Sequence, residues 1–235
     1  MPIVLEDYLN YMETIKGVSP NTTKEYFYDL RGFFRFIKIR FNLIDKDTPF
    51  EEIPIDDINM ELIKTIRLQD LHAYIAYVDR NKNNKNSSKS RKVSSLKSFF
   101  DYLYSIVDLI DDNPADKLEF PKAEIRQPVY LTLDESKKLL DTVLQVENEF
   151  IRKRDYAIVL LFLNCGLRLS ELVSINIGTI KDDTLTVIGK GNKQRTIYLN
   201  TACINAIEDY LKIRPKDAKD KNALFLSTRK QRMSN

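Results

Sequence analysis

The sequence predicts a mainly α-helical protein with a small β component, divided into two domains that are joined by a linker. Apolar residues recur at helical spacing over residues 1–112 and predict a small helical bundle. Residues 113–128 contain three prolines among mixed charges and predict an extended linker. Residues 129–235 combine further helices with a β-hairpin, so a second domain of the α+β type is expected there.

The bundle begins with a predicted helix over Val4–Ile15, whose apolar residues lie at helical spacing and which ends at Gly17. Ser19 and Pro20 then suit the N-cap and the first position of a second helix. Residues 41–68 are acidic and contain two prolines, so we expect a long connection with short helical pieces.

Two further helices complete the predicted bundle. One covers Leu68–Val78 and has one apolar face. The other follows the polar run NKNNKNSS, in which Ser87 and Ser88 are N-cap candidates, and extends to about Tyr104. Its apolar stripe predicts burial against the bundle, and lysines, arginine and serines occupy much of the rest.

The second domain is expected to start near Leu131. Thr132 and Glu135 fit a capping box that begins its first helix. The later predicted elements are helices at Arg154–Leu163 (ended by Asn164-Cys165-Gly166), from about Leu169 and at Thr201–Ile213, a hairpin of Thr184–Ile188 with Arg195–Leu199, and a short strand at Ala223–Ser227.

Charge is distributed unevenly along the chain, although the net charge is only +3. Residues 41–79 carry nine acids against three bases, whereas residues 80–100 carry seven bases and no acid. Residues 121–235 carry 20 bases against 14 acids. Local basic surface is what a nucleic-acid binder needs.

Composition excludes several classes of protein and site. No apolar run reaches the length of a membrane span, and the N-terminus carries acids where a signal peptide needs bases. Cys165 and Cys203 could pair, but a reduced, cytoplasmic protein is the simpler interpretation. The one histidine, His72, rules out a histidine-rich metal site, and we interpret it as structural.

Arg168 is the first candidate for chemistry. It follows a glycine that ends a helix, in the segment CGLRLSEL, so it should project from a constrained turn. A planar guanidinium with five donors suits the grip of a phosphate from two sides. Glu171, three residues on, would lie beside it on one helical face and hold its geometry. The alternative is an ordinary surface pair near a helix start.

Lys190 is the second candidate, because it lies at the tip of the predicted hairpin between Gly189 and Gly191. Glycines allow a tight turn and close approach of a ligand, and a lysine there could donate a proton to a leaving oxygen. The alternative is a solvated lysine in a turn. A phosphate-binding P-loop is excluded, because its motif is missing and this turn joins two strands.

The basic helix is the third candidate, since lysines and hydroxyls on one side of a helix suit phosphate contact and base-edge recognition. The start of the second helix offers another phosphate site. The alternative is a solvated charged face. The predicted DNA contacts are Ser19, Thr22, Thr23, Lys24, Lys85, Ser88, Lys89, Arg91, Lys92, Ser95, Lys97, Lys193 and Arg195.

A resemblance to a known family rests on two segments of the second domain, RDYAIVLLFLNCGLRLSELVSINIGTI and TLTVIGKGNKQRTIYL. Both closely resemble the tyrosine recombinase (phage integrase) family, and within it the Xer-like bacterial recombinases. The N-terminal unit resembles that family's SAM-like core-binding domain, with SPNTTKEYFYDLRGFFRFI and NSSKSRKVSSLKSFFDYL in the expected order. The linker also fits, so the resemblance covers essentially the whole chain.

The resemblance implies roles for three residues. Arg168 would be the first catalytic arginine, which neutralises charge on the scissile phosphate. Glu171 matches the acidic residue that supports it, and Lys190 matches the hairpin lysine that protonates the departing 5′ oxygen. No metal or cofactor is needed in the family, because arginines stabilise the charge and a tyrosine forms a 3′-phosphotyrosyl link.

The sequence departs from the family after the hairpin. The H-x-x-R motif, a later His or Trp and the nucleophilic Tyr are not found in these 235 residues, which end at QRMSN. The last tyrosine, Tyr210, lies in a helix that should precede the missing motif. We therefore expect the N-terminal and central part of a recombinase, which binds duplex DNA but does not cleave it.

The resemblance implies that a full-length form exchanges DNA strands as a tetramer on two DNA sites, with the two domains forming a clamp around one half-site. One alternative is a non-catalytic protein that occupies recombination sites. Another is a helical protein-interaction module, favoured by the acidic residues 41–79, but it leaves the Arg168 and Lys190 segments unexplained. Type IB topoisomerases share the chemistry in outline, whereas the linker and bundle favour the Xer-like family.

Overall fold

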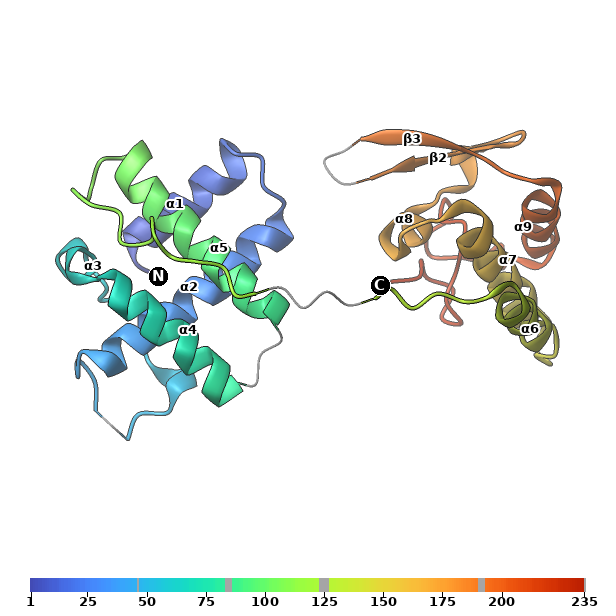
Figure 1. The fold of residues 1–235 in the computed structure, drawn as a ribbon. Coiled ribbons are helices and arrows are strands. Elements are labelled where there is room, and N and C mark those ends of the chain that lie inside the picture. The colour runs from blue at the N-terminus through green and yellow to red at the C-terminus, as the bar shows by residue number, and fades with distance from the viewer. Residues whose placement is uncertain (46, 83–85, 123–126, 190–192, 235) are drawn as a thin grey trace. The chain divides into compact units, whose positions relative to one another are not determined.

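A computed structural model describes residues 1–45, 47–82, 86–122, 127–189 and 193–234 and divides the chain into two compact units. The first unit is Met1–Gln127 and the second is Pro128–Asn235 (Figure 1). Each unit has its own hydrophobic core. None of the described helices is both long and apolar enough to cross a membrane.

The first unit is the predicted helical bundle. Ser19 caps its second helix as expected, since the Ser19 Oγ accepts a hydrogen bond from the Thr22 N–H at 3.3 Å and Pro20 begins the helix. The elements are α1 Ile3–Thr14, α2 Pro20–Arg40, η1 Phe50–Glu52, α3 Met60–Thr65, α4 Leu68–Lys82, α5 Asn86–Asp101 and a π-helical turn, η2, at Tyr102–Ile106.

The prediction that Ser87 or Ser88 caps the basic helix is wrong. Helix α5 already begins at Asn86, so both serines lie inside its first turn. Helix starts inferred from a cap residue are uncertain by one or two positions when several polar residues follow one another. The helix also ends earlier than expected, because the backbone changes to the wider π-helical turn after Asp101.

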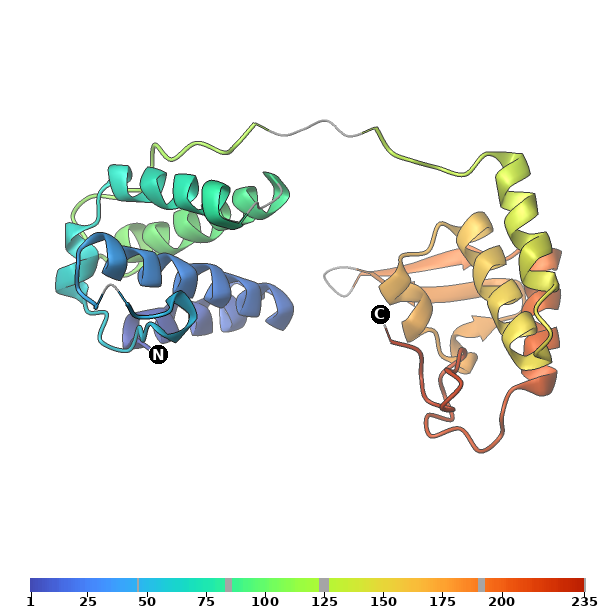
Figure 2. The ribbon, with the colours of Figure 1, turned by 90° about the horizontal axis from the view of Figure 1, so that it is seen from below.

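Aromatic side chains fill the core between α2 and α5, which lie side by side (Figures 1 and 2). Phe33 and Phe34 of α2 meet Phe99 and Phe100 of α5, and all four side chains are fully buried. The Phe33–Phe100 and Phe34–Phe99 ring centroids lie 6.2 and 5.7 Å apart in edge-on contact. Such contacts add to the hydrophobic gain from burial and fix the relative rotation of the two helices.

The long acidic connection is held against α2 by two basic side chains of that helix. Arg35 Nε donates to the Ile53 carbonyl at 3.0 Å. Lys38 Nζ lies 2.8 Å from Asp57 Oδ1 and also donates to the Pro54 carbonyl. Both basic side chains are buried, so part of the acidic charge between residues 41 and 59 compensates charge inside the unit.

Part of the segment predicted as a linker is packed on the first unit. Ala115 and Leu118 are buried in its core. Lys97 Nζ donates to the carbonyls of Ala115, Asp116 and Leu118 at 2.9, 2.8 and 3.1 Å. Three carbonyl acceptors around one ammonium anchor this segment to α5.

The second unit combines helices with a three-stranded antiparallel sheet in the order β1-β2-β3 within the described residues. Helices α7 and α8 lie under one face of the sheet, and α6 packs beside α7 (Figures 1 and 2). The elements are α6 Leu133–Leu144, α7 Glu149–Cys165, α8 Leu169–Ser174, η3 Ile177–Thr179, β1 Ile180–Lys181, β2 Thr184–Ile188, β3 Gln194–Tyr198 and α9 Thr201–Ile213.

Local signals in the second unit are confirmed. Thr132 and Glu135 form the predicted capping box, in which Thr132 Oγ1 accepts from the Glu135 N–H and Glu135 Oε2 accepts from the Thr132 N–H. Helix α7 ends at Gly166, whose φ of 56° lies in the left-handed region. The hairpin pairs β2 with β3 from Thr184↔Tyr198 to Ile188↔Gln194.

The predicted strand at Ala223–Ser227 is wrong. The structure has isolated bridges there, Asn176↔Ala223 and Leu226↔Arg232, in the part of the chain that it describes. The guanidinium of Arg214 donates to the carbonyls of Ala223 and Leu224, at 2.7 and 3.3 Å. These carbonyls are therefore taken by a side chain, and a regular ladder does not continue through them.

Replacing Phe100 by alanine is expected to lower the free energy of unfolding of the first unit by about 3–5 kcal/mol, because the change leaves a cavity among the core rings. Urea unfolding followed by circular dichroism measures this. Phe120→Ala is the matched control, since Phe120 is 54% exposed. Equal effects of the two changes would contradict the described core.

Candidate active site and nucleic-acid interface

A buried carboxylate, that of Glu171 on α8, organises the candidate site. Its side chain is only 2% exposed. Glu171 Oε1 accepts a hydrogen bond from Arg168 Nη1 at 2.8 Å, and Oε2 accepts from the Arg168 N–H at 2.8 Å. The prediction that Glu171 lies beside Arg168 is confirmed. The same Oε2 also accepts from Arg195 Nη2 at 2.9 Å, so the structure brings a predicted DNA contact into the site.

The local backbone explains the position of Arg168. Gly166 ends α7 in the left-handed region, and Leu167 then buries its side chain in the core. Arg168 is the extended N-cap residue of α8, with φ −75° and ψ 152°. Glu171 is the third residue of that helix, where a carboxylate can accept from the N-cap N–H. The turn therefore presents the arginine side chain outward and its N–H inward.

The electrostatics of the site favour a charged glutamate. The hydrogen bond from the Arg168 N–H, and then the two guanidinium groups, hold the pKa of Glu171 below its usual range, although burial opposes this. The side chains of Arg168 and Arg195 are 66% and 45% exposed. Each guanidinium thus uses part of its donor set on Glu171 and retains donors that face solvent.

The hairpin approaches this pair closely through Gly189. Its N–H donates to the Lys193 carbonyl at 2.8 Å. A Cβ atom at Gly189 would lie 3.4 Å from Glu171 Oε1 and 3.8 Å from Arg168 Nη1, which is ordinary van der Waals contact, so the hairpin backbone lies directly beside the pair. Lys190, which follows Gly189 in the chain, lies outside the described residues. Lys193 is exposed.

A cavity of about 460 Å³ opens beside the two charged residues. It lies between α8, η3 and β2, and hydroxyl and amide groups are prominent in its lining. The polar lining residues other than Arg168 and Glu171 are Ser170, Ser174, Asn176, Thr179 and Thr186. The Ser174 and Thr179 hydroxyls donate to the Glu171 and Asn176 carbonyls, at 2.8 and 2.7 Å. The Arg168 guanidinium with the Ser170 or Thr186 hydroxyl is an arrangement that can bind a phosphate oxygen.

On α5, two of the predicted DNA contacts are bound to a buried aspartate of α2. Arg91 Nη1 lies 2.6 Å from Asp29 Oδ2, and Lys92 Nζ lies 2.5 Å from Asp29 Oδ1. The Asp29 side chain is 1% exposed, and burial raises its pKa although two cations contact it. These cations join α5 to α2, so a lysine-rich stretch serves the fold as well as the surface.

The predicted DNA contact at Ser95 is wrong. Ser95 is fully buried and its hydroxyl donates to the Lys92 carbonyl, so it cannot reach DNA. Lys97 is half-buried, and its ammonium group donates to three carbonyls of the packed linker segment. Lys89 is paired with Asp79 at 2.6 Å. Lys85 lies outside the described residues.

The remaining predicted contacts gather at the start of α2 and α5. Ser19 and Thr22 are exposed and share a hydrogen bond of 2.9 Å between their hydroxyls. Lys24 is exposed, whereas Thr23 is buried and bonds the Ser19 carbonyl at 3.3 Å. Ser88 is half-buried. Thr23 therefore supports the turn, and Lys24 contributes an exposed cation to this group.

Sequence reasoning missed two residues of α2 that continue from Lys24. Arg31 Cζ lies 4.9 Å from the ring centroid of Tyr28, and Lys24 Nζ lies 5.8 Å from it. Tyr28 is 41% exposed, so an aromatic ring stands between two cations on the surface. The spacing of four and three residues was present in the sequence, and it places these side chains on one helical face.

His72 is exposed on α4 and lines a surface groove with Ile75 and Phe120, so it does not belong to the core. Within the described residues, no three histidine, cysteine, aspartate or glutamate side chains gather as metal ligands would.

Comparison with known proteins places the chain in a family. Residues 129–235 match the model of the phage integrase family. The chain is 56% identical to tyrosine recombinase XerC of Caldanaerobacter subterraneus subsp. tengcongensis, over 99% of this chain and 65% of that protein. It is 32% identical to tyrosine recombinase XerC of Psychromonas ingrahamii, over 98% of this chain and 71% of that protein. The chain belongs to the tyrosine recombinase family.

The fold agrees with that of solved tyrosine recombinases. A lambda integrase tetramer bound to a Holliday junction superposes with a TM-score of 0.65 at 18% identity, over 98% of this chain and 58% of that one. The predicted fold class is therefore confirmed. This recombinase chain spans 65% of the length of its Caldanaerobacter relative.

Glu171→Gln is expected to lower the free energy of unfolding at pH 7 by about 1–3 kcal/mol, since charge-assisted hydrogen bonds are lost. Because the folded-state pKa of Glu171 is lowered, its contribution is present above the unfolded-state pKa and is lost as pH falls through the folded-state pKa. The difference between the two proteins should therefore shrink from pH 7 to pH 3 in urea unfolding. The exposed Glu208→Gln provides the control, and a pH-independent difference would contradict the assignment.

Proposed function

We propose that this chain is the DNA-binding and phosphate-activating part of a site-specific recombinase that cuts and rejoins DNA through a 3′-phosphotyrosyl intermediate. The observation that carries the proposal is the pair of exposed guanidinium groups, Arg168 and Arg195, held by one buried carboxylate. A fixed cation with free donors lowers the energy of a phosphoryl transition state, because negative charge grows on the equatorial oxygens.

Each residue of the site has a separate role in this proposal. Arg168 donates to a non-bridging oxygen of the scissile phosphate, and Glu171 fixes the plane of its guanidinium. Arg195 shares the same carboxylate and offers further donors to the phosphate or its neighbour. Lys190 protonates the 5′ oxygen that departs, which is the role that the family resemblance implies for the hairpin lysine. The attacking tyrosine is supplied from outside these 235 residues.

Tyr210 is a poor candidate for that nucleophile. It is fully buried, stacked on Phe225 with 5.5 Å between the ring centroids. Its hydroxyl oxygen accepts the Leu226 N–H at 3.1 Å. Burial also raises its pKa, which disfavours the phenolate. A phosphate could not reach this oxygen without opening the core.

The first unit would bind the duplex through the exposed start and face of α2. Lys24, Tyr28 and Arg31 provide cations and a ring that can contact phosphates and sugars, and the hydroxyls of Ser19 and Thr22 can add phosphate contacts. Binding of both units to one half-site, and of four protomers to two sites, is supported by the fold shared with the lambda integrase tetramer. Contact with DNA agrees with the cytoplasmic location that the sequence predicts.

A non-catalytic protein that occupies recombination sites is the second candidate function. Lys89, Arg91 and Lys92 pair with acids of the first unit, which reduces the basic surface of α5. The basic surface of α2 is unaffected by these pairs. The coding sequence after Asn235 separates the two, since an in-frame H-x-x-R motif and a later tyrosine favour the enzyme.

Binding to random duplex DNA should weaken steeply with salt, by a slope of about −0.9 in log affinity against log salt for each phosphate contacted. Lys24→Ala should weaken binding and lower this slope by about 1. Fluorescence anisotropy across a salt series measures both. Lys64→Ala on α3 is the charge-matched control, because Lys64 is equally exposed but adjoins the acidic segment. If Lys24→Ala leaves the salt slope unchanged, the start of α2 does not contact the DNA.

The chain is expected to form no covalent adduct with a nicked suicide substrate, because the H-x-x-R motif and the tyrosine that follows it in the family are not found in these 235 residues, and Tyr210 is buried. Denaturing electrophoresis of labelled DNA detects a 3′-phosphotyrosyl link, with an active full-length tyrosine recombinase as the positive control. A shifted band that persists in Tyr210→Phe would reveal another nucleophile, and one that disappears would assign the chemistry to Tyr210.

A further inference from the structure

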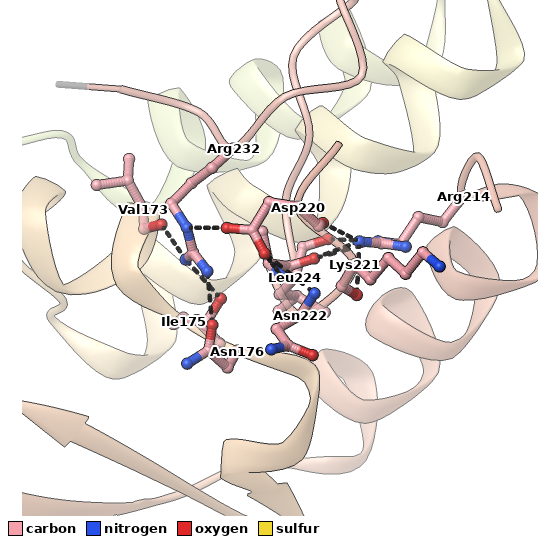
Figure 3. A network of polar contacts seen from close by, with 10 residues as sticks. Val173, Ile175, Asn176, Arg214, Asp220, Lys221, Asn222, Leu224 and Arg232 are labelled. Carbon is pink, nitrogen blue, oxygen red and sulfur yellow. Dashed lines mark hydrogen bonds and ion pairs between the residues drawn. The ribbon is translucent and has the colours of Figure 1, made fainter. Parts of the chain in front are cut away.

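A network of polar contacts centred on Arg232 joins the last part of the chain to the end of α8 (Figure 3). Arg232 Nη1 donates to the Val173 carbonyl at 2.9 Å and to the Ile175 carbonyl at 3.3 Å. Its Nη2 donates to Asn176 Oδ1 at 2.6 Å, and its Nε donates to Asp220 Oδ2 at 2.8 Å. One planar guanidinium therefore holds four acceptors on two separate segments.

The segment around Asp220 is built to receive this arginine. Asp220 Oδ1 accepts the N–H groups of Asn222 and Ala223, both at 3.1 Å, so the carboxylate is fixed by its own backbone. The Asn222 carbonyl accepts the Ile177 N–H at 2.8 Å, and the Leu224 N–H donates to the Ile175 carbonyl at 2.9 Å. Backbone bonds thus run alongside the side-chain contacts.

Arg214 grips the same segment from the other side (Figure 3). Its Nη2 donates to the carbonyls of Asp220, Lys221 and Ala223, at 3.1, 3.2 and 2.7 Å. The segment that faces Arg232 is therefore tied to the end of α9. The Asp220 segment is therefore anchored, and the contact with Arg232 fixes the position of the end of α8 and does not act through charge alone.

The end of α8 needs such support because the helix has only six residues. Four C-terminal carbonyls of a helix have no partner within it. Here the Val173 and Ile175 carbonyls obtain partners from Arg232, and the Leu172 carbonyl accepts the Ile175 N–H at 3.2 Å. The other end of this short helix carries Arg168 and Glu171 together, so a turn or tilt of α8 would move this pair away from Arg195 on β3, which donates to Glu171 Oε2 at 2.9 Å.

We propose that Arg232 is a positioning residue for the candidate active site: by clamping the C-terminal end of α8 to the Asp220 segment, it sets the orientation of Glu171 and so of Arg168 and Arg195. Arg232 touches no substrate in this role. The inference rests on the proposed function only in treating Arg168 and Glu171 as the phosphate-activating pair.

The test uses the whole chain labelled with ¹³C and ¹⁵N, and it follows the Glu171 carboxyl and the Arg195 guanidinium by NMR as pH is lowered. In Arg232→Gln the Glu171 carboxyl should titrate at a higher pH than in the original chain, because Arg195 on β3 no longer contacts it. The Arg195 Nη signals should broaden, since this guanidinium loses its bond to Glu171. The matched control is Arg229→Gln, since Arg229 is exposed and lies three residues away.

Two conservative variants keep the test decisive if Arg232→Gln unfolds the second unit. Arg232→Lys retains the charge and can reach Asp220 but cannot hold Val173 and Asn176 together, so it should shift the Glu171 titration in the same direction. Asp220→Asn weakens the ion pair and should give a smaller shift. If these variants lower thermal stability but leave the Glu171 titration and the Arg195 signals unchanged, Arg232 is structural only and the inference is overturned.

Duplex binding of the original chain, measured in parallel at low salt, separates this inference from the proposed function. If the Glu171 titration is the same in the Arg232 variants as in the original chain, and the original chain binds DNA, only the role of Arg232 is removed. A clear Glu171 shift in a chain that binds no DNA supports the clamp and removes the proposed function.

Discussion

The second unit depends on the neutralisation of one buried carboxylate. Glu171 is almost completely inaccessible, and an unpaired charge in that position would be costly, so donors must converge on it. They come from the N-cap of α8 and from β3, which are otherwise separate parts of the chain. The end of α7, helix α8 and the hairpin meet at this anion. The two arginines are thereby oriented before any phosphate arrives, which is the condition for electrostatic preorganisation.

Features set by neighbouring residues could be predicted from the sequence. The cap at Ser19, the capping box of Thr132 with Glu135, the left-handed Gly166 and the hairpin each rest on the conformational preferences of a few adjacent residues. The contact between Arg168 and Glu171 belongs to the same class, because three residues along a helix bring side chains together. The fold class followed from the order of these elements, and the family resemblance added the expected roles of Arg168, Glu171 and Lys190.

Partners distant in sequence could not be predicted in the same way. Asp29 lies more than sixty residues from Arg91 and Lys92, and nothing in the basic run indicates that these cations are already paired. The same holds for Lys97, whose acceptors are backbone carbonyls, and for the link of Arg195 to Glu171. A lysine-rich helix has one pattern whether its charges face DNA, water or a buried acid. Three-dimensional proximity alone separates these cases.

The arginines that hold residues 220–226 bind almost wholly to main-chain carbonyls. Arg214 contacts those of Asp220, Lys221, Ala223 and Leu224, and Arg154 contacts that of Leu226 at 3.0 Å. A carbonyl is present whatever the side chain, so the exposed positions Lys221 and Asn222 can accept substitutions without losing these bonds, provided that the backbone path is kept. Sequence drift is constrained instead at the arginines, at Asp220, whose carboxylate binds Arg232, and at positions 223–226, whose side chains are buried in the core. Mutational tolerance and mutational sensitivity are thus separated between neighbouring residues of one short segment.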